Sequence, residues 1–152
     1  GWSPSATIAQ TTPEISRRVF SLNAEAPTLI IARAWPILVR QAKAEGSGAV
    51  IVNTSSIATV DPFPMLYAYA AAKSAVNTLA KSVAKEGKAL GIRAYSVAPG
   101  AVETELLRSL LPATALPSSK TLRPEAVAQV IVDCVLGRRA EASGSTILLP
   151  SP

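Results

Sequence analysis

The sequence predicts an α/β fold of the Rossmann type, a doubly wound parallel sheet of which the chain holds about one half. Helical and strand-like segments alternate along the chain, an order typical of parallel strands connected by helices. Hydrophobic residues make up 49% of the 152 residues and aromatic residues 5%, a balance common in sheets covered by helices. The alternation provides three strands, whereas the complete fold is built from two βαβαβ halves. We therefore expect residues 1–152 to form a single domain, the second half of such a sheet.

The first long helical segment is expected to begin near Thr11, which has a glutamate at capping-box spacing and Pro13 at an early position. Helical periodicity continues to about residue 45. Pro27 and Pro36 should bend or divide this helix, because proline removes a backbone donor and clashes with the preceding turn.

The later elements are bounded by glycine and proline. Gly46-Ser47-Gly48 should end the first long helix, and Gly87 or Gly91 should end the second. In the second long helix, helical spacing relates the apolar residues Ala71, Ala75, Leu79 and Val83. We expect short buried strands at 49–53, 92–98 and 146–149, and helices at 67–86, 103–111 and 124–136.

The composition excludes several classes of function. The net charge of +5 is spread over both halves of the chain, so no nucleic-acid surface is expected. The sequence has no histidine and one cysteine, Cys134, which excludes an intrachain disulfide, a Cys/His zinc site and His-dependent catalytic triads; no metal is expected. Cys134 lies in an apolar run and is expected to be a small core residue. The sequence shows neither a membrane span nor a secretory signal, so we expect a cytoplasmic protein.

Tyr69 and Lys73 form the pair of greatest chemical interest. At positions i and i+4 the phenol and the ammonium share one helix face, where the cation should lower the pKa of the phenol toward a range useful for acid–base catalysis. Chance supplies such a pair in roughly one chain of this composition in eight, so the pair alone is weak evidence.

The surroundings of the pair add specificity. Ser56 precedes Tyr69 by 13 residues and follows a predicted strand, and Pro99-Gly100 follows the next strand. Because open α/β sheets bind ligands beyond the carboxyl ends of their strands, these segments should converge on one crevice with the helix that begins after Thr104.

Taken together, Asn53-Thr-Ser-Ser56, Tyr69-Ala-Ala-Ala-Lys73 and Val97-Ala-Pro-Gly-Ala-Val-Glu-Thr104 resemble the short-chain dehydrogenase/reductase family in order and spacing. The segment from Arg18 through Asn23 to Pro36 is similar to the family helix that contributes an active-site asparagine. The resemblance runs from about residue 14 to residue 149 and marks the chain as the carboxy-terminal, catalytic portion of the family's fold.

This resemblance implies an NAD- or NADP-dependent oxidoreductase that interconverts a secondary alcohol and a ketone, or reduces a related carbonyl. Tyr69 would exchange a proton with the substrate oxygen, and Lys73 would lower its pKa and bind the nicotinamide ribose. Ser56 would hold the substrate oxygen, with Ser55 as the alternative, and Asn23 would organise a proton relay. The remaining cofactor contacts would come from Pro99, Gly100, the backbone of Val102 and the hydroxyl of Thr104.

The resemblance also implies that the two long helices pair with symmetry mates in a homodimer or homotetramer, with small residues such as Ala68, Ala71, Ala72 and Ala75 at the contacts. The family's glycine-rich turn and first strands have no counterpart, and Gly46-x-Gly48 precedes a strand where that turn would follow one. We expect the nucleotide-binding half to be absent and the choice between NAD and NADP to be set there.

Other interpretations stay open at this point. The chain could be a truncated, non-catalytic remnant that folds or associates without turnover. Ser82-Val-Ala-Lys85 matches a pattern of some acyl-transfer enzymes but lies in a regular helix without companion motifs. Asn23 could cap or kink a helix, and Thr104 could cap the short helix after it. The leucines at 106, 107, 110 and 111 could line a substrate pocket or pack as core.

Overall fold

A computed structural model describes residues 1–45 and 48–152 of the chain. Its centre is a parallel sheet of three strands, β1 (Ala49–Thr54), β2 (Ile92–Pro99) and β3 (Thr146–Leu149), in the order β1-β2-β3. The predicted α/β class, the parallel direction and the three strand positions are confirmed, each strand to within one residue.

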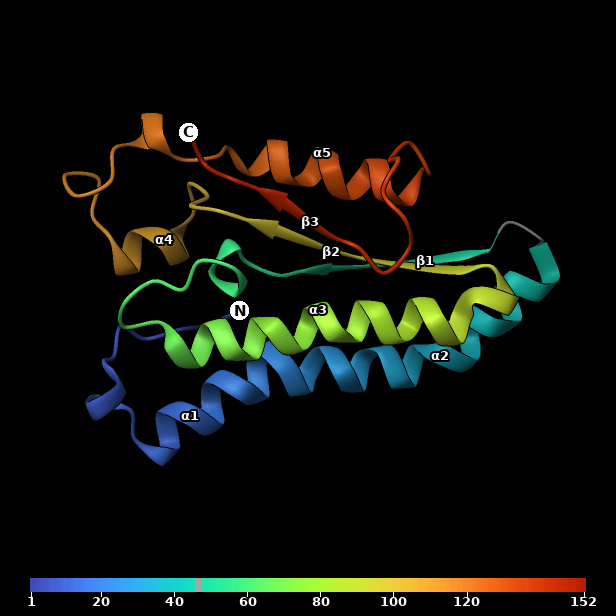
Figure 1. Cartoon of the computed structure of the whole chain (residues 1–152), viewed down its shortest axis with the longest axis horizontal. Coiled ribbons are helices and arrows are strands. Elements are labelled where there is room, and N and C mark those ends of the chain that lie inside the picture. Colours follow the sequence, from blue (N-terminus) through green and yellow to red (C-terminus); the bar gives the residue numbers. More distant parts are fainter. Residues whose placement is uncertain (46–47) are drawn as a thin grey trace.

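Helices cover both faces of this sheet. Two long helices, α2 (Ala26–Glu45) and α3 (Tyr67–Gly87), run side by side below it in Figure 1, and α5 (Pro124–Val135) lies above it. The short helix α4 (Glu105–Leu110) lies beyond the carboxyl end of β2, at the left of the view. The carboxyl end of the sheet is therefore framed by loops and by α4.

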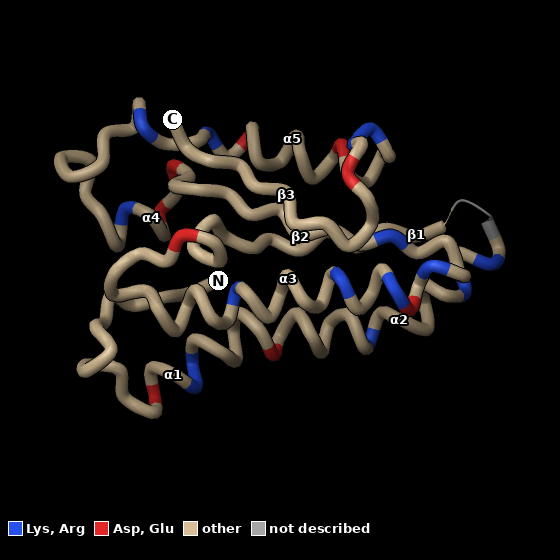
Figure 2. The backbone as a smooth tube through the Cα atoms, viewed as in Figure 1, with Lys and Arg blue, Asp and Glu red and all other residues tan. Residues whose placement is uncertain are grey.

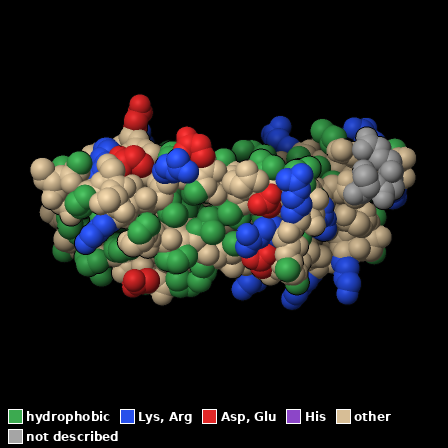
Figure 3. Space-filling view, turned by 90° about the horizontal axis from the view of Figure 1, so that it is seen from above, with side chains coloured by type: hydrophobic (Ala, Val, Ile, Leu, Met, Phe, Trp, Pro, Cys, Tyr) green, Lys and Arg blue, Asp and Glu red, His purple; other side chains and the backbone are tan. Residues whose placement is uncertain are grey.

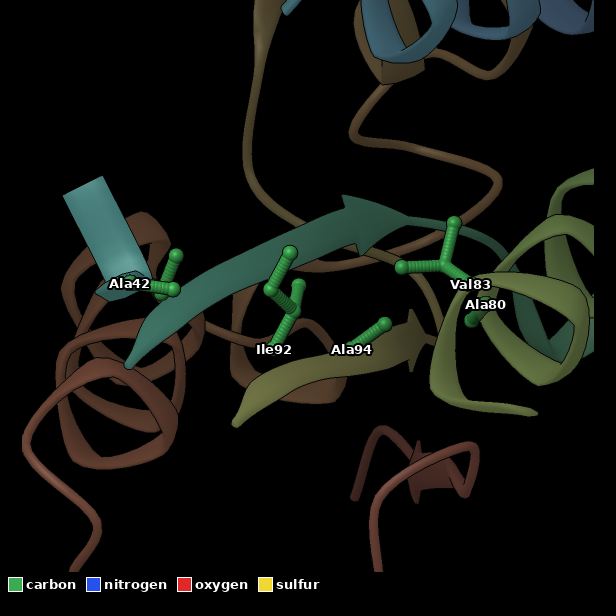
Figure 4. Close-up of a cluster of buried hydrophobic side chains, with 6 residues drawn as sticks. Ala42, Ala80, Val83, Ile92 and Ala94 are labelled. Carbon is green, nitrogen blue, oxygen red and sulfur yellow. The ribbon is translucent and has the colours of Figure 1, made fainter. Parts of the chain in front are cut away.

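The core between the sheet and the two long helices is built from small residues. Ala80 and Ala94 are fully buried and Ile92 is 2% exposed, which lets the helices lie close to the strands. Figure 4 shows side chains of α2, α3 and β2 converging in this layer. The buried members are Ala42, Ala49, Ala80, Val83, Ile92 and Ala94.

The first long helix is divided next to Pro27, the second residue of α2, as predicted, but it is not divided at Pro36. A short helix α1 (Pro13–Phe20) passes through one π-helical turn (Ser21–Glu25) into α2. Pro36 lies inside α2 without breaking it, because flanking side chains such as Trp35 and Val39 pack against the core and hold the helix in place. The predicted start was one residue early, since the hydroxyl of Thr12 caps α1 by accepting a hydrogen bond from the backbone of Ile15.

The apolar face of α3 also differs from the expected one. Ala71 is exposed, and the most buried positions lie one residue further along, at Ala72, Val76 and Ala80. Ala68 and Ala72 pack against Val19 within the chain, so they are not free for a helix of a second subunit. An alanine-rich helix is apolar on several faces, and spacing alone could not choose among them.

Two glycines bring the start of β1 close to the turn before β2. Gly48 and Gly91 have φ of 73° and 71°, in the left-handed region. A Cβ atom on Gly48 would lie 2.3 Å from the carbonyl oxygen of Gly91. Of the residues expected to end the first long helix, Gly46 and Ser47 lie outside the described residues; Gly87 is the last residue of α3, as expected.

Candidate active site

The hydroxyl groups of Ser56 and Tyr69 meet at the carboxyl end of β1. Ser56 caps the short 3-10 helix after β1, and its Oγ accepts a hydrogen bond from the backbone N–H of Ala58 at 3.2 Å. Tyr69 lies in the first turn of α3 and is half-buried, and the Ser56 side chain is near enough to lower the pKa of its phenol. The residues between Ser56 and Tyr69 therefore form a loop that brings the phenol back to the serine.

Lys73 lies one turn further along α3 and is buried, with 8% of its surface exposed. Its Nζ donates a hydrogen bond to the carbonyl oxygen of Thr54 at 2.9 Å and lies 5.6 Å from the centre of the Tyr69 ring. This bond uses one of the three N–H groups of the ammonium, and the others are available for ligand hydroxyls.

Ser55 has a structural place instead. It is 2% exposed, and its Oγ donates a hydrogen bond to the backbone oxygen of Lys73 at 3.3 Å. This bond ties the end of β1 to α3 and turns Ser55 away from the phenol. Of the two serines, the geometry therefore brings Ser56 to Tyr69.

Asn23 lies in the π-helical turn and is 2% exposed. Its Nδ2 donates hydrogen bonds to the backbone oxygens of Val19 and Trp2, at 2.9 and 2.8 Å. Its Oδ1 is buried and has no partner in the described part of the chain. A Cβ on Gly1 would lie 2.5 Å from this oxygen and 3.6 Å from Lys73 Nζ, so the amide oxygen and the ammonium flank one small space.

The segment after β2 forms the opposite side of the site. The backbone N–H of Gly100 donates to Leu149 at 2.8 Å, and a Cβ there would meet Ser151. Val102 forms an isolated parallel bridge with Leu122, and its partly buried side chain packs against the core cluster that includes Val127 and Cys134 of α5. Pro99, the last residue of β2, is buried.

The exposed Thr104 caps α4. Its Oγ1 accepts a hydrogen bond from the backbone of Leu107 at 3.3 Å and donates one to the carbonyl oxygen of Val102 at 3.2 Å. The predicted helix at 103–111 is shorter for this reason and runs from Glu105 to Leu110.

Sequence reasoning missed the pair Glu103 and Arg108. The guanidinium binds the carboxylate through Nε and Nη2, at 2.6 and 2.5 Å, and its Nη1 donates to the backbone oxygen of Leu116 at 2.8 Å. The hydroxyl of Thr121 donates to the same carboxylate at 3.0 Å. The pair is five residues apart, which matches no helical spacing, so only the fold reveals that it fastens the loop after α4.

The pKa of Tyr69 shifts in the direction opposite to the expected one. Burial raises the pKa of the phenol, and the hydrogen bond with Ser56 opposes this only in part. Burial also lowers the pKa of Lys73, whose ammonium is turned toward Thr54. The phenol is therefore protonated at neutral pH and is set up as a proton donor.

Acidification is expected to leave Glu103 ionised until about pH 2. Hydrogen bonds from Arg108 hold the pKa of Glu103 at about 2, below its ordinary value of 4.5. Because the pKa is lower in the folded chain, the pair contributes stability that is complete above about pH 4.5 and is lost as the pH falls through about 2. Carboxyl ¹³C NMR titration checks this. Arg108→Gln should return the pKa toward 4.5, and an unchanged pKa in that variant would contradict the assignment.

Across residues 1–45 and 48–152, no cluster of three or more His, Cys, Asp or Glu residues is arranged to hold a metal ion. Within the same ranges, no helix has the length and apolarity needed to cross a membrane. Cys134, in the last turn of α5, is fully buried, as expected for a core residue.

Comparison with known proteins gives consistent results. A family model described as short chain dehydrogenase matches residues 1–115. An NADPH-dependent aldehyde reductase-like protein of Arabidopsis thaliana, described as chloroplastic, is 37% identical over 136 residues, which are 90% of this chain and 44% of that protein. A 3alpha-hydroxysteroid dehydrogenase of Mediterraneibacter gnavus is 34% identical over 122 residues, 80% of this chain and 47% of that protein.

Solved structures agree with the fold. One described as a short chain dehydrogenase/reductase family protein has a TM-score of 0.86 at 28% identity, covering 99% of this chain and 62% of that one. A 3-ketoacyl-(acyl-carrier-protein) reductase from Brucella melitensis complexed with NADH has the same TM-score at 24% identity and shows the fold alone. The chain thus spans less than half the length of these two sequence relatives and about three fifths of the solved structures.

Proposed function

The chain belongs to the short-chain dehydrogenase family, and on that basis we propose that the full-length protein is an NAD- or NADP-dependent oxidoreductase. Its reaction would interconvert a secondary alcohol and a carbonyl compound. The observation that carries this proposal is the placement of Ser56 next to the phenol of Tyr69, with the buried ammonium of Lys73 5.6 Å from the Tyr69 ring centre. The dehydrogenase and reductase names of the sequence relatives support the same general chemistry.

In this proposal Tyr69 moves a proton to or from the substrate oxygen. Ser56 would hold the substrate oxygen beside the phenol, because the Ser56 side chain already lies next to the phenol of Tyr69. A phenol kept neutral by burial suits the reducing direction, in which the carbonyl oxygen needs a proton.

A nicotinamide cofactor, when bound, would supply or accept the hydride. The residues present fit such a group, because Lys73 Nζ has N–H groups free for the ribose hydroxyls. The backbone at Val102 and the hydroxyl of Thr104 would contact its carboxamide end, and Pro99 and Gly100 would supply further contacts. The hydroxyl of Thr104 would serve while still capping α4.

Asn23 would organise a proton relay through its unpartnered Oδ1. This buried oxygen and the Lys73 ammonium flank one space, and a water molecule there would satisfy both groups. A relay at this position would return protons from solvent to the phenol.

We further propose a homodimer or homotetramer of the full-length protein. A row of apolar side chains at helical spacing supports it, lying on α2 and the π-helical turn and pointing to solvent: Leu22 at 47%, Leu29 at 52%, Ile30 at 67% and Ile37 at 56% exposed. The cytoplasmic location expected from the sequence stays a prediction.

Replacing Lys73 by Met in the full-length gene product is expected to lower kcat/KM about 100-fold and to weaken cofactor binding. The substitution removes the charge and its hydrogen bonds while keeping a side chain of similar length. Reduction of a panel of ketones and aldehydes with NADH and NADPH gives the rates, and calorimetry gives the cofactor affinity.

Lys81→Met is the matched control, because Lys81 is exposed on the same helix two turns further along. It should behave like the unmodified protein. Equal rates for Lys73→Met and Lys81→Met would rule out the proposed part of Lys73, and no reduction of any carbonyl would overturn the function itself.

A further inference from the structure

We infer that the site accepts an uncharged carbonyl compound with an apolar substituent and discriminates against anionic ones. This inference rests on the proposed function and names the substrate class of the same site. Three features carry it: a pocket beside Tyr69, the side chains of the loop that leads to it, and the placement of charges.

The pocket is a shallow depression of about 10 Å³ between the amino-terminal segment, α1 and the start of α3, and Tyr69 is one of its walls. An apolar substituent would lie against this depression instead of filling it. A backbone hydrogen bond from Ala6 to Met65, 3.0 Å long, ties two of its sides together. In the described part of the chain every lining side chain is uncharged: Ser3, Pro4, Ala6, Thr11, Ile15, Val19, Met65, Leu66, Tyr67, Ala68 and Tyr69.

The loop between Ser56 and Tyr69 presents large apolar side chains to solvent. The exposed fractions are 60% for Val60, 49% for Phe63, 43% for Met65 and 42% for Tyr67. Four such side chains within eight residues exceed the scattered exposure of an ordinary surface. They make the approach to Tyr69 apolar.

The cation in the loop after β2 is already paired. Within residues 99–119 the sequence has one basic residue, Arg108. Its five N–H groups donate to the two carboxylate oxygens of Glu103, to the backbone oxygens of Leu111 and Leu116 and to the hydroxyl of Ser118. It has no N–H group left to receive a substrate carboxylate or phosphate with similar geometry.

The loops on the amino-terminal and Ser56 sides add no cation before Lys73. Residues 1–13 carry no charged side chain, and residues 54–72 carry one, the acidic Asp61. Of the two arginines of α1, Arg17 is paired with Glu14 at 3.0 Å and Arg18 lies 4.2 Å from the centre of the Trp2 ring. Figure 2 shows most lysines and arginines at the opposite end of the sheet, where the strands begin. In Figure 3 hydrophobic side chains gather at the left, over the end that holds α4.

The physical consequence is a preference set by desolvation. An anionic group entering this apolar approach would lose water and gain no ion pair, which is costly, whereas an alkyl or aryl group gains by burial. The expected preference is at least about 100-fold in kcat/KM for a neutral ketone over its carboxylated counterpart.

Two substrates of the same shape test the inference on the full-length gene product. 4-Methylacetophenone and 4-acetylbenzoate share ring and carbonyl and differ in the methyl and carboxylate groups. We expect the neutral ketone to be reduced at least about 100-fold more efficiently. Equal efficiencies, or a preference for the anion, would overturn the inference.

A charge placed at the pocket should change this ratio. Tyr67→Lys puts an ammonium at an exposed position of the lining and should lower the preference about tenfold. Tyr67→Phe controls for the lost hydroxyl, and Leu148→Lys, at a similarly exposed apolar residue of β3, controls for added charge. In both controls the ratio of kcat/KM for the neutral ketone to kcat/KM for the anionic ketone should stay that of the unmodified protein.

A binding measurement separates the inference from the reaction. Met65 is the one methionine of the chain and lines the pocket, so its ¹³C-labelled methyl group gives a single NMR probe in the 152-residue chain, assigned with Met65→Leu. We expect 4-methylacetophenone to shift this signal saturably and 4-acetylbenzoate to leave it in place.

The outcomes are distinct. If the methyl signal shifts as expected while neither ketone is reduced, the proposed function fails and the pocket's preference stands. If both ketones are reduced with dependence on Tyr69 but the signal is unmoved, or moves equally with both, the function stands and the inference fails.

Discussion

Tyr69→Phe in the full-length protein is expected to lower kcat for carbonyl reduction by about 10³-fold while changing the cofactor dissociation constant less than about threefold. The substitution removes one oxygen and leaves the ring, which packs with Val19 and Ala68. Ser56 loses its partner, and the substrate oxygen loses its proton donor. Single-turnover measurements and calorimetry give the two quantities.

Tyr95→Phe is the matched control, because it removes the same hydroxyl from a tyrosine of β2 that is buried in the core on the α5 side of the sheet. It should keep the rate of the unmodified protein. Substantial turnover by Tyr69→Phe would remove Tyr69 from the mechanism. The raised pKa of Tyr69 adds a pH dependence: reduction should persist up to the pKa of the phenol, above 10, and fall as the pH rises through it.

Gly48→Ala is expected to destabilise the chain by at least about 3 kcal/mol. The residue combines a φ of 73° with a Cβ position only 2.3 Å from the backbone oxygen of Gly91, so the substitution adds a steric clash to the backbone strain. The atom in the way is backbone, and it cannot yield without moving the turn before β2. Urea denaturation followed by circular dichroism measures the loss.

Gly91→Ala separates the two contributions. Its φ of 71° is nearly the same, but the nearest atom to a Cβ there is 3.6 Å away, an ordinary contact. It should cost only about 1–2 kcal/mol, from backbone strain alone. Equal losses for the two variants would show that the close approach of the two turns contributes nothing.

The order of elements could be predicted because each strand is a short apolar run between glycine or proline signals. β3 at residues 146–149 is a clear case, with both ends as expected. The buried face of α3 could not be predicted, because Ala71 and Ala72 are equally apolar and only the positions of the sheet and Val19 decide between them. The prediction that Pro36 would divide the helix was wrong. Proline usually interrupts a helix, but here the neighbours of Pro36 pack against the core and the helix continues.

For the candidate site, the sequence could predict that Ser56, Tyr69 and Lys73 lie close together, because a short loop and one helical turn connect them. The sequence could not predict the pKa values of these residues or the ion pairs around them. The pKa of Tyr69 depends on burial, to which the packing of Tyr69 against Val19 of α1 contributes, and the spacing of Tyr69 and Lys73 contains no information about that packing. The pairing of Glu103 with Arg108 was hidden for a similar reason, since it depends on how the loop after α4 returns.

The π-helical turn at Ser21–Glu25 has a consequence for the rotational phase of the first two helices. Such a turn holds one residue more than an α-helical turn, and each residue of an α-helix advances the side-chain direction by about 100°. Val19 before the turn and Trp35 after it both face inward, so the extra residue keeps two otherwise mismatched helices in phase with the core. Deleting a single residue such as Leu22 would restore a continuous α-helix, rotate α1 about its axis and carry Asn23 away from Lys73.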